Sequence, residues 1–192
     1  MGKSGYSFIY DELEAAEPVT WSYLLHTVTN PMSVDKTKEY VHIQATGKDG
    51  VSDAYLFSAG TLKTDTTDRF FVPAVNWLRA DEKGNFKPYP NHWHFTATSE
   101  KQKVYRFATI VYTHAKADST ETAPRKLKDG SIQVGDWNIR ANISTAGKPS
   151  FEVRNTRKGY NASVNYKDYG ATVIHDNGKT TTLKDEIPEL EI

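Results

Sequence analysis

The sequence predicts an all-β protein, an antiparallel β-sandwich built from stacked sheets. Apolar and polar residues alternate with a period of two along most of the chain, which is the pattern of strands with one buried face. Hydrophobic residues make up 38% of the chain and aromatic residues 12%, so the core depends on Tyr, Phe and Trp, which favour pleated surfaces. Helical periodicity never persists beyond about two turns. Many strands separated by turns favour stacked sheets, with a closed barrel as the second choice.

The first expected strands lie at the N-terminal end. Tyr6, Phe8 and Tyr10 share one face of the first strand. The acidic run 14–17, before Pro18, is expected to form a solvated turn. The next strand has an apolar face that consists of Val19, Trp21, Tyr23 and Leu25. Because a strand so close to Met1 would fray without support, we expect the chain to be a fragment of a larger multidomain protein.

Several further strands are expected in the middle of the chain. Turn residues and alternation place them at Tyr40–Thr46, Asp53–Ala59, Phe70–Val75, His92–Thr98 and Val104–His114. The last of these is apolar on both faces, which predicts a central position in a sheet. Residues 79–91 and 116–130 are polar and without periodicity, and they are expected to form long loops.

After Gly130 the expected strands are shorter and more polar. The strongest hairpin signal is Asp176–Lys179, because its Asn-Gly pair supplies the positive φ angles of a tight turn. We therefore expect two parts: residues 1–130 as the main sandwich, and residues 131–192 as an outer hairpin-rich sheet or subdomain.

Composition excludes several kinds of protein. Lys and Arg together number 24, as do Asp and Glu, so the chain has no basic excess for nonspecific nucleic-acid binding. The chain has no cysteine, which excludes disulfides, thiolate metal sites and a cysteine nucleophile. No apolar run approaches the roughly 18 residues of a membrane span, so no membrane partner is expected.

Histidines give the most site-like local pattern. His92 and His94 are expected to project from one strand face, with Trp93 on the other. Two imidazoles at this spacing can bind zinc if a third ligand is present. The alternative is a solvated strand face beside a core face. His26 and His114 each end a strand, where an imidazole can meet a ligand or simply bond a neighbouring group, whereas His42 has no acidic or histidine neighbour in the sequence.

Aromatic and basic residues also allow sugar binding, because aromatic faces stack on pyranose rings and guanidinium groups bind carboxylate or sulfate. The candidate substrate-binding residues are Tyr89, His92, Trp93, His94, Arg154 and Arg157. The alternative is that the aromatic residues are core and the basic residues are ordinary surface. The carboxylates show no pairing typical of a glycosidase, and no catalytic residue is predicted.

Two phrases resemble the β-sheet region of heparinase II/III-like polysaccharide lyases. The first is Tyr10-Asp-Glu-Leu-Glu-Ala, and the second, after a short turn, is Trp21-Ser-Tyr-Leu-Leu-His26. Trp93–Glu100 and Tyr105–Tyr112 are similar to later strands of that region. The resemblance spans about residues 6–115 and is a strand pattern rather than a catalytic signature.

This resemblance implies a function. Such lyases combine a helical toroid with a stacked β-sandwich and cleave uronate-containing glycans, such as heparin and heparan sulfate, by β-elimination. A base removes the proton on carbon 5 of the uronate, and a Tyr or His acid protonates the leaving oxygen. The toroid supplies most of these groups, and histidines from the first β-strands complete the cleft.

The same resemblance implies that this chain is the non-catalytic sandwich, inactive alone, with the toroid and an acidic polysaccharide as partners and a periplasmic or extracellular location. It also implies an exposed apolar strip around Tyr6–Leu25, where the toroid would dock. His26 resembles a zinc ligand whose companions would lie upstream of Tyr6, so no cofactor is expected in this chain alone. The alternatives are an autonomous carbohydrate-binding module and a purely structural domain.

Overall fold

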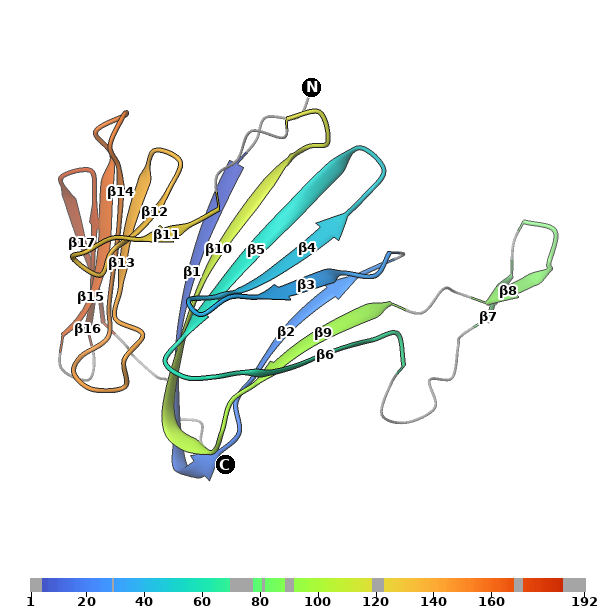
Figure 1. Ribbon diagram of the computed structural model, residues 1–192, viewed down its shortest axis with the longest axis horizontal. Helices are drawn as coiled ribbons and strands as arrows, with labels where there is room; N and C mark the ends of the chain where they lie inside the picture. Colours follow the sequence, from blue (N-terminus) through green and yellow to red (C-terminus); the bar gives the residue numbers. More distant parts are fainter. Residues whose placement is uncertain are drawn as a thin grey trace.

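The computed structural model describes residues 5–28, 30–69, 78–80, 82–88, 92–118, 123–167 and 171–184. Every regular element in these residues is a β-strand, and the strands pair antiparallel. They form three packed sheets and one separate two-stranded hairpin (Figure 1). The predicted all-β sandwich of stacked antiparallel sheets is confirmed.

The middle layer is a five-stranded sheet with the order β1-β10-β5-β4-β3. Its strands are β1 (Gly5–Val19), β3 (Ser33–Lys36), β4 (Val41–Thr46), β5 (Gly50–Ser58) and β10 (Gln102–Ala115). β10 lies between β1 and β5 and is buried along most of its length. Its predicted central position is confirmed, because apolar side chains on both faces need a sheet covered on both sides.

A three-stranded sheet covers one face of the middle layer, with the order β2-β9-β6. Its strands are β2 (Ser22–Thr27), β6 (Lys63–Thr67) and β9 (Trp93–Thr98). Between these two sheets lies the first core, whose buried members are Met32, Val41, Ile43, Ala54, Leu56, Leu62, Phe95, Ala97, Tyr105 and Phe107.

A seven-stranded sheet covers the other face, with strands β11 to β17 in chain order. Its strands are β11 (Arg125–Lys126), β12 (Ile132–Val134), β13 (Trp137–Ala141), β14 (Ser150–Asn155), β15 (Asn161–Lys167), β16 (Ala171–Asp176) and β17 (Lys179–Lys184). The second core lies between it and the middle layer, with buried members Tyr55, Phe57, Ala108, Ile110, Ile132, Val134, Ile139 and Val153. The domain division at residue 130 stays a prediction of the sequence.

The predicted hairpin at the end of the chain is confirmed. Asn177 has a φ of 45° and Gly178 a φ of 87°, as a primed two-residue turn requires, and they join β16 to β17. A second hairpin, β7 (Leu78–Ala80) with β8 (Phe86–Pro88), stands away from the three sheets in Figure 1.

Trp21 fixes the corner where the chain passes from the middle sheet to the three-stranded sheet. Its backbone N–H donates to Ser99 Oγ at 3.0 Å, and its indole Nε1 donates to the carbonyl of Gln102 at 3.0 Å. Ser99 and Gln102 lie at the corner where β9 passes into β10. Hydrogen bonds therefore join the two corners. The β1–β2 connection and the β9–β10 connection both pass between the middle sheet and the three-stranded sheet.

Three expectations about connections are wrong. The run 14–17 belongs to β1, which continues to Val19 with a register irregularity after Glu14. Glu14 pairs with Val104 and Val19 pairs with Gln102, so the pairing with β10 resumes beyond this polar run. Ladder hydrogen bonds do not depend on side-chain polarity. Residues 79–91 include parts of β7 and β8, and 116–130 include β11. The strand expected at Phe70–Val75 lies outside the described residues.

Most apolar residues of the expected docking strip pack against the two cores of this chain. Tyr6, Phe8 and Tyr10 pack against the second core, and Leu13, Trp21, Tyr23 and Leu25 pack against the first. The large apolar side chains of this stretch that are exposed are Ile9, Val19 and Leu24. They lie on two different strands rather than in one row.

Candidate functional site

The structure brings together two histidines that lie far apart in the sequence, His26 and His94. His26 near the end of β2 and His94 on β9 are opposite partners in the antiparallel ladder. Their ring centroids are 4.6 Å apart, with an interplanar angle of 85°. Both project from the outer face because the alternate residues, Leu25 and Phe95, point into the first core.

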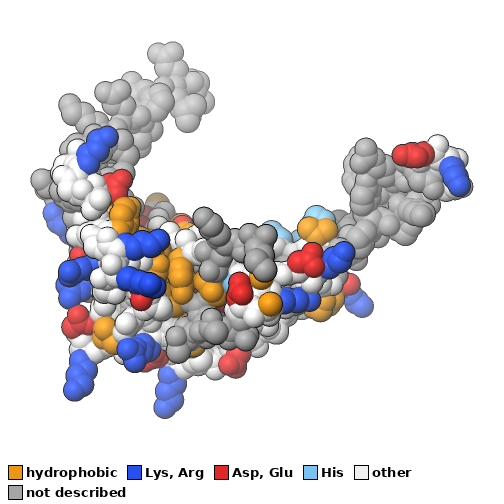
Figure 2. All heavy atoms as spheres, turned by 90° about the horizontal axis from the view of Figure 1, so that it is seen from above, with side chains coloured by type: hydrophobic (Ala, Val, Ile, Leu, Met, Phe, Trp, Pro, Cys, Tyr) orange, Lys and Arg blue, Asp and Glu red, His pale blue; other side chains and the backbone are white. Residues whose placement is uncertain are grey.

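His92 precedes β9 by one residue and has the same strand parity as His94. It is exposed, and its charge contributes to the environment of His94. Two exposed apolar residues of the same region flank His26, namely Leu24 with 56% of its surface exposed and Val28 with 59%. We call His26, His92, His94, Leu24 and Val28 the histidine face. Figure 2 shows histidine side chains beside hydrophobic ones on this surface.

Electrostatics favours a neutral imidazole at His94. Burial lowers the pKa of His94, and the nearby imidazoles of His26 and His92 lower it further. The ordinary pKa of a histidine is 6.5, so a lowered pKa leaves the ring of His94 uncharged at neutral pH. A neutral imidazole can donate one hydrogen bond, accept another, or bind a metal through a lone pair.

The zinc site suggested at His26 lacks a complete set of ligands among the described residues. No three His, Cys, Asp or Glu side chains of the described ranges come close enough together to hold a metal ion. A structural zinc site normally needs four ligands. The pair His26 and His94 is therefore a partial site at most within this part of the chain.

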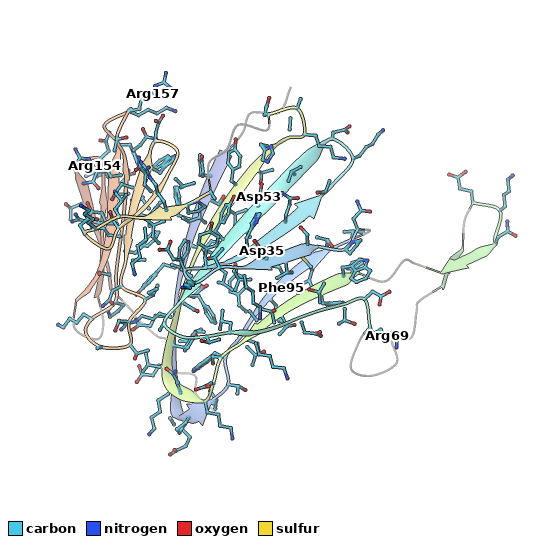
Figure 3. The ribbon with its side chains drawn as sticks, viewed as in Figure 1. Asp35, Asp53, Arg69, Phe95, Arg154 and Arg157 are labelled. Carbon is cyan, nitrogen blue, oxygen red and sulfur yellow. The ribbon has the colours of Figure 1, made fainter. Side chains whose placement is uncertain are left out.

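The other predicted substrate-binding residues do not join the histidine face. Trp93 is half-buried and packs against the first core. Arg154 on β14 and Arg157 in the following turn lie on the seven-stranded sheet, across the middle layer from Phe95 (Figure 3). Tyr89 lies outside the described residues.

Arg154 and Arg157 form a separate exposed basic edge. Arg154 is exposed, and the side chain of Arg157 is 82% exposed. Arg157 forms an ion pair with Asp136, with Nη1 to Oδ2 at 3.8 Å. An exposed ion pair at that distance is weak, so this guanidinium can turn to another anion.

Sequence reasoning missed a polar network centred on Asp53, a buried residue of β5 (labelled in Figure 3). His42 Nε2 donates to Asp53 Oδ1 at 2.8 Å, and Gln44 Nε2 donates to the same oxygen at 2.9 Å. His114 Nε2 donates to Oδ2 at 3.2 Å. Burial raises the pKa of Asp53, but the hydrogen bonds from Gln44, His42 and His114 outweigh it, so the net pKa is lowered.

Part of this network had a signal in the sequence. The turn at Gly47–Gly50 fixes the register of β4 against β5, and that register places Gln44 opposite Asp53. His114 comes from β10, 61 residues after Asp53, and no local pattern indicates that pairing. The expectation that His42 has no acidic neighbour is therefore wrong for the folded chain, because His42 contacts Asp53.

Comparison with protein-family models and with curated protein sequences gives no match. The described part of the chain has no helix with the length and hydropathy that a membrane span requires.

Proposed function

We propose that this chain is the non-catalytic β-sandwich part of a polysaccharide lyase that acts by β-elimination on uronate-containing glycans of the heparin and heparan sulfate type. In this proposal the sandwich supports the catalytic toroid, and its histidine face borders the cleft and holds the acidic glycan. The enzyme as a whole would be secreted to the periplasm or beyond.

The observation that carries the proposal is the contact between His26 and His94. His26 ends the phrase that resembles the lyase strand, and the resemblance implies that histidines of the first strands complete the cleft. The ladder places His94 directly opposite His26, so that a second imidazole joins the first on one exposed surface.

The chemistry of this face suits an acidic sugar. Imidazole N–H groups can donate to carboxylate and sulfate oxygens, and such charge-assisted hydrogen bonds are stronger than neutral ones. Leu24 and Val28 offer apolar surface next to His26 for the C–H face of a pyranose ring. No step of bond cleavage is assigned to these residues, because the toroid would supply most of the acid and base groups.

The direct test is calorimetric titration of the chain with a heparan sulfate oligosaccharide at about 50 and about 200 mM salt. We expect salt-sensitive binding that the double variant His26→Ala/His94→Ala weakens by about tenfold, or about 1.4 kcal/mol. The matched control is Arg154→Ala/Arg157→Ala, which removes two cationic groups on the other side of the middle sheet and should change the affinity less than about twofold. Unchanged binding in the histidine variant would overturn the proposal for this face.

The autonomous carbohydrate-binding module is the second candidate, and the exposed edge at Arg154 and Arg157 favours it. It predicts the opposite result, in which the arginine variant loses binding and the histidine variant keeps it. Lack of binding to either acidic or neutral glycans would favour a purely structural domain.

The toroid partner has its own test. A longer protein that includes the upstream domain should melt at a higher temperature than this chain, because domain docking buries surface and stabilises the sandwich. An unchanged melting temperature for the sandwich would count against that partner.

A further inference from the structure

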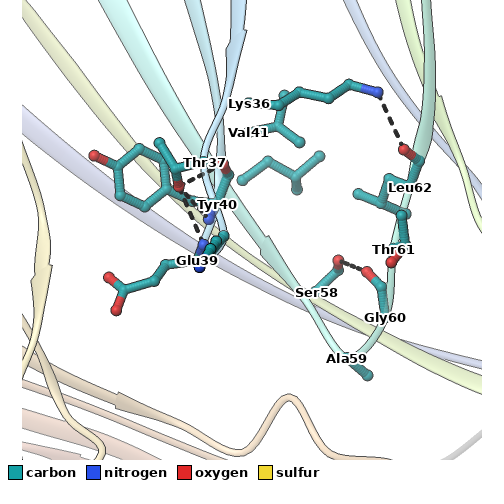
Figure 4. Close-up of a pocket in the computed structure, with 12 residues that line it drawn as sticks. Lys36, Thr37, Glu39, Tyr40, Val41, Ser58, Ala59, Gly60, Thr61 and Leu62 are labelled. Carbon is teal, nitrogen blue, oxygen red and sulfur yellow. Dashed lines mark hydrogen bonds between the residues drawn. The ribbon is translucent and has the colours of Figure 1, made fainter.

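A pocket of about 420 Å³ lies between two turns at one end of the first core (Figure 4). One wall is the turn from β3 to β4, and the other is the turn from β5 to β6. Its apolar floor consists of three buried residues of the first core, Val41, Leu56 and Leu62. This volume lies within the range of about 300–1,000 Å³ that is typical of small-molecule sites.

Hydrogen bonds within the chain fix both walls of the pocket. Thr37 Oγ1 donates to the carbonyl of Tyr40 at 3.0 Å and accepts from the backbone N–H groups of Glu39 and Tyr40. On the opposite wall, Ser58 Oγ donates to the carbonyl of Gly60 at 2.7 Å. The walls are therefore ordered before any ligand arrives, which lowers the entropy cost of binding.

The rim carries two lysines and one glutamate. Lys36 Nζ donates to the carbonyl of Leu62 at 3.3 Å, which places an ammonium group across the mouth between the two walls (Figure 4). An ammonium has three donors, so Lys36 retains two for a ligand. Lys38 and Glu39 are exposed on the same rim, and the net charge of these three side chains is positive.

A buried hydroxyl lies behind the pocket wall. Tyr105 is 1% exposed, and its hydroxyl has no hydrogen-bond partner among the described residues. A Cβ atom built on Gly60 would lie 3.8 Å from this hydroxyl, so the hydroxyl lies close to a residue that lines the pocket. A buried polar group without a partner needs an explanation, and a polar ligand atom or bound water at Gly60 would provide one.

We infer that this pocket binds one uronate residue of an acidic glycan. The apolar floor takes the C–H face of the sugar ring, Lys36 and Lys38 bind the carboxylate, and the Thr37, Ser58 and Thr61 side of the rim faces the sugar hydroxyls. The choice of an acidic sugar rests on the proposed function, but the site is a different one. β6 pairs with β9 so that Lys63 lies opposite Thr98 and Thr67 lies opposite His94. Lys63 directly follows Leu62 of the pocket, so the pocket lies roughly 15 Å along the strand from the histidine face.

The test is an NMR titration of the whole chain with sodium glucuronate, and with glucose as the uncharged probe. Glucuronate should shift the backbone amide signals of 37–41 and 58–62, and glucose should bind at least about fivefold more weakly, because it lacks the carboxylate. Glucuronate that shifts no signal in these two turns, or glucose that binds equally well, would overturn the inference.

Matched variants separate this site from general charge. Lys36→Ala/Lys38→Ala should weaken glucuronate binding about tenfold, whereas Lys63→Ala/Lys103→Ala, with the same loss of charge outside the pocket, should change it less than about twofold. Equal weakening by both pairs would contradict a defined site. Because Lys36 also bonds Leu62, each variant is first checked by thermal unfolding, and Lys38→Ala alone serves if the double variant is unfolded.

The same variants distinguish failure of the pocket from failure of the proposed function. With a heparan sulfate oligosaccharide, loss of affinity only in His26→Ala/His94→Ala would support the histidine face and overturn the pocket. Loss only in Lys36→Ala/Lys38→Ala would support the pocket and overturn the role of the histidine face.

Discussion

The imidazole of His114 on β10 and the carboxylate of Asp53 on β5 form a hydrogen-bonded pair inside the protein. His114 Nε2 donates to Asp53 Oδ2 at 3.2 Å, and His114 Nδ1 donates to the carbonyl of Ala115 at 2.8 Å. The two groups that His114 contacts, the Asp53 carboxylate and the Ala115 carbonyl, only accept hydrogen bonds. The lowered pKa of Asp53 keeps this carboxyl group ionised at neutral pH. Both ring nitrogens of His114 therefore take part in hydrogen bonds, which fixes the orientation of the ring. Tyr112 stacks on the ring of His114, with ring centroids 4.8 Å apart.

The first prediction concerns the charge of Asp53. Asp53→Asn should lower the free energy of unfolding by about 2–3 kcal/mol at neutral pH, because the carboxylate accepts hydrogen bonds from three side chains and an amide cannot accept all of them. Urea denaturation measures this loss. Asp49→Asn, at an exposed position of the adjoining turn, is the control and should cost less than about 0.5 kcal/mol.

The sign of the pH effect follows from the lowered pKa of Asp53. A carboxyl group whose pKa is lower in the folded state stabilises the fold above its unfolded value of 3.8. This stabilisation is lost as the pH falls through the lower folded value. The difference in the free energy of unfolding between the wild type and Asp53→Asn should therefore be complete at about pH 6 and should shrink below about pH 4. A difference that stays constant down to acid pH would show that Asp53 acts through packing alone.

The second prediction concerns the histidine pair. His26→Gln should raise the pKa of His94, because it removes one of the neighbouring imidazoles that lower it. Burial, the largest cause, is retained, so the pKa of His94 should stay below 6.5. NMR titration of the His94 ring measures both effects. Ser22→Ala, farther along the same face of β2, should leave the titration unchanged.

His94 also predicts a pH dependence of stability. Its pKa is lower in the folded than in the unfolded state, so the unfolded chain binds more protons as the pH falls below 6.5. Stability from this residue should therefore decrease from about pH 7 towards its lower folded pKa. His94→Gln should flatten this part of the stability curve. An equally steep curve in that variant would assign the dependence to other groups.

The third prediction concerns Arg106, a buried residue of β10 that is 3% exposed. Its Nη2 donates to Glu12 Oε1 at 2.8 Å and to the carbonyl of Gly147 at 3.0 Å, and its Nη1 donates to the carbonyl of Ser144. It thus joins β1 to the loop between β13 and β14 of the seven-stranded sheet.

Arg106→Ala should lower the free energy of unfolding by about 3–5 kcal/mol, because it leaves Glu12 and two carbonyls without their donor. Arg106→Lys should recover only part of this loss, since an ammonium cannot reproduce the forked geometry. Arg140→Ala is the control and should cost far less, because 61% of that side chain is exposed. Hydrogen exchange should show weaker protection at 144–147 in the Arg106 variants only.

The fourth prediction concerns Gly135, which has a φ of 51° in the turn between β12 and β13. A Cβ atom at this position would lie 2.8 Å from the Tyr6 hydroxyl oxygen, which is too close. Gly135→Ala should therefore cost about 2 kcal/mol or more, because the left-handed backbone conformation alone costs about 1–2 kcal/mol.

A double-mutant cycle separates the two causes. Tyr6→Phe removes the clashing oxygen, so Gly135→Ala should cost less in that background, and the difference measures the steric part. Equal costs in both backgrounds would assign the whole effect to the backbone.

Local alternation was enough to predict most strands and their faces. Tyr6, Phe8 and Tyr10 face one core and Tyr23 and Leu25 the other, as expected from period two. The hairpin at Asn177-Gly178 was predictable because its turn depends on two adjacent residues. The β4–β5 register could also have been derived from its short turn, and with it the contact between Gln44 and Asp53.

The sequence by itself determined the all-β class, the inward and outward faces of its strands and the hairpins closed by short turns, since these depend on neighbours along the chain. Tertiary structure alone decided that β1 pairs with β10, that β2 pairs with β9, and that three sheets stack with β10 in the middle. It therefore also decided which functional groups meet: His26 with His94, and His114 with Asp53. The physical reason is that pairing between distant strands is selected by the packing of two whole cores, and no residue's local pattern contains that information.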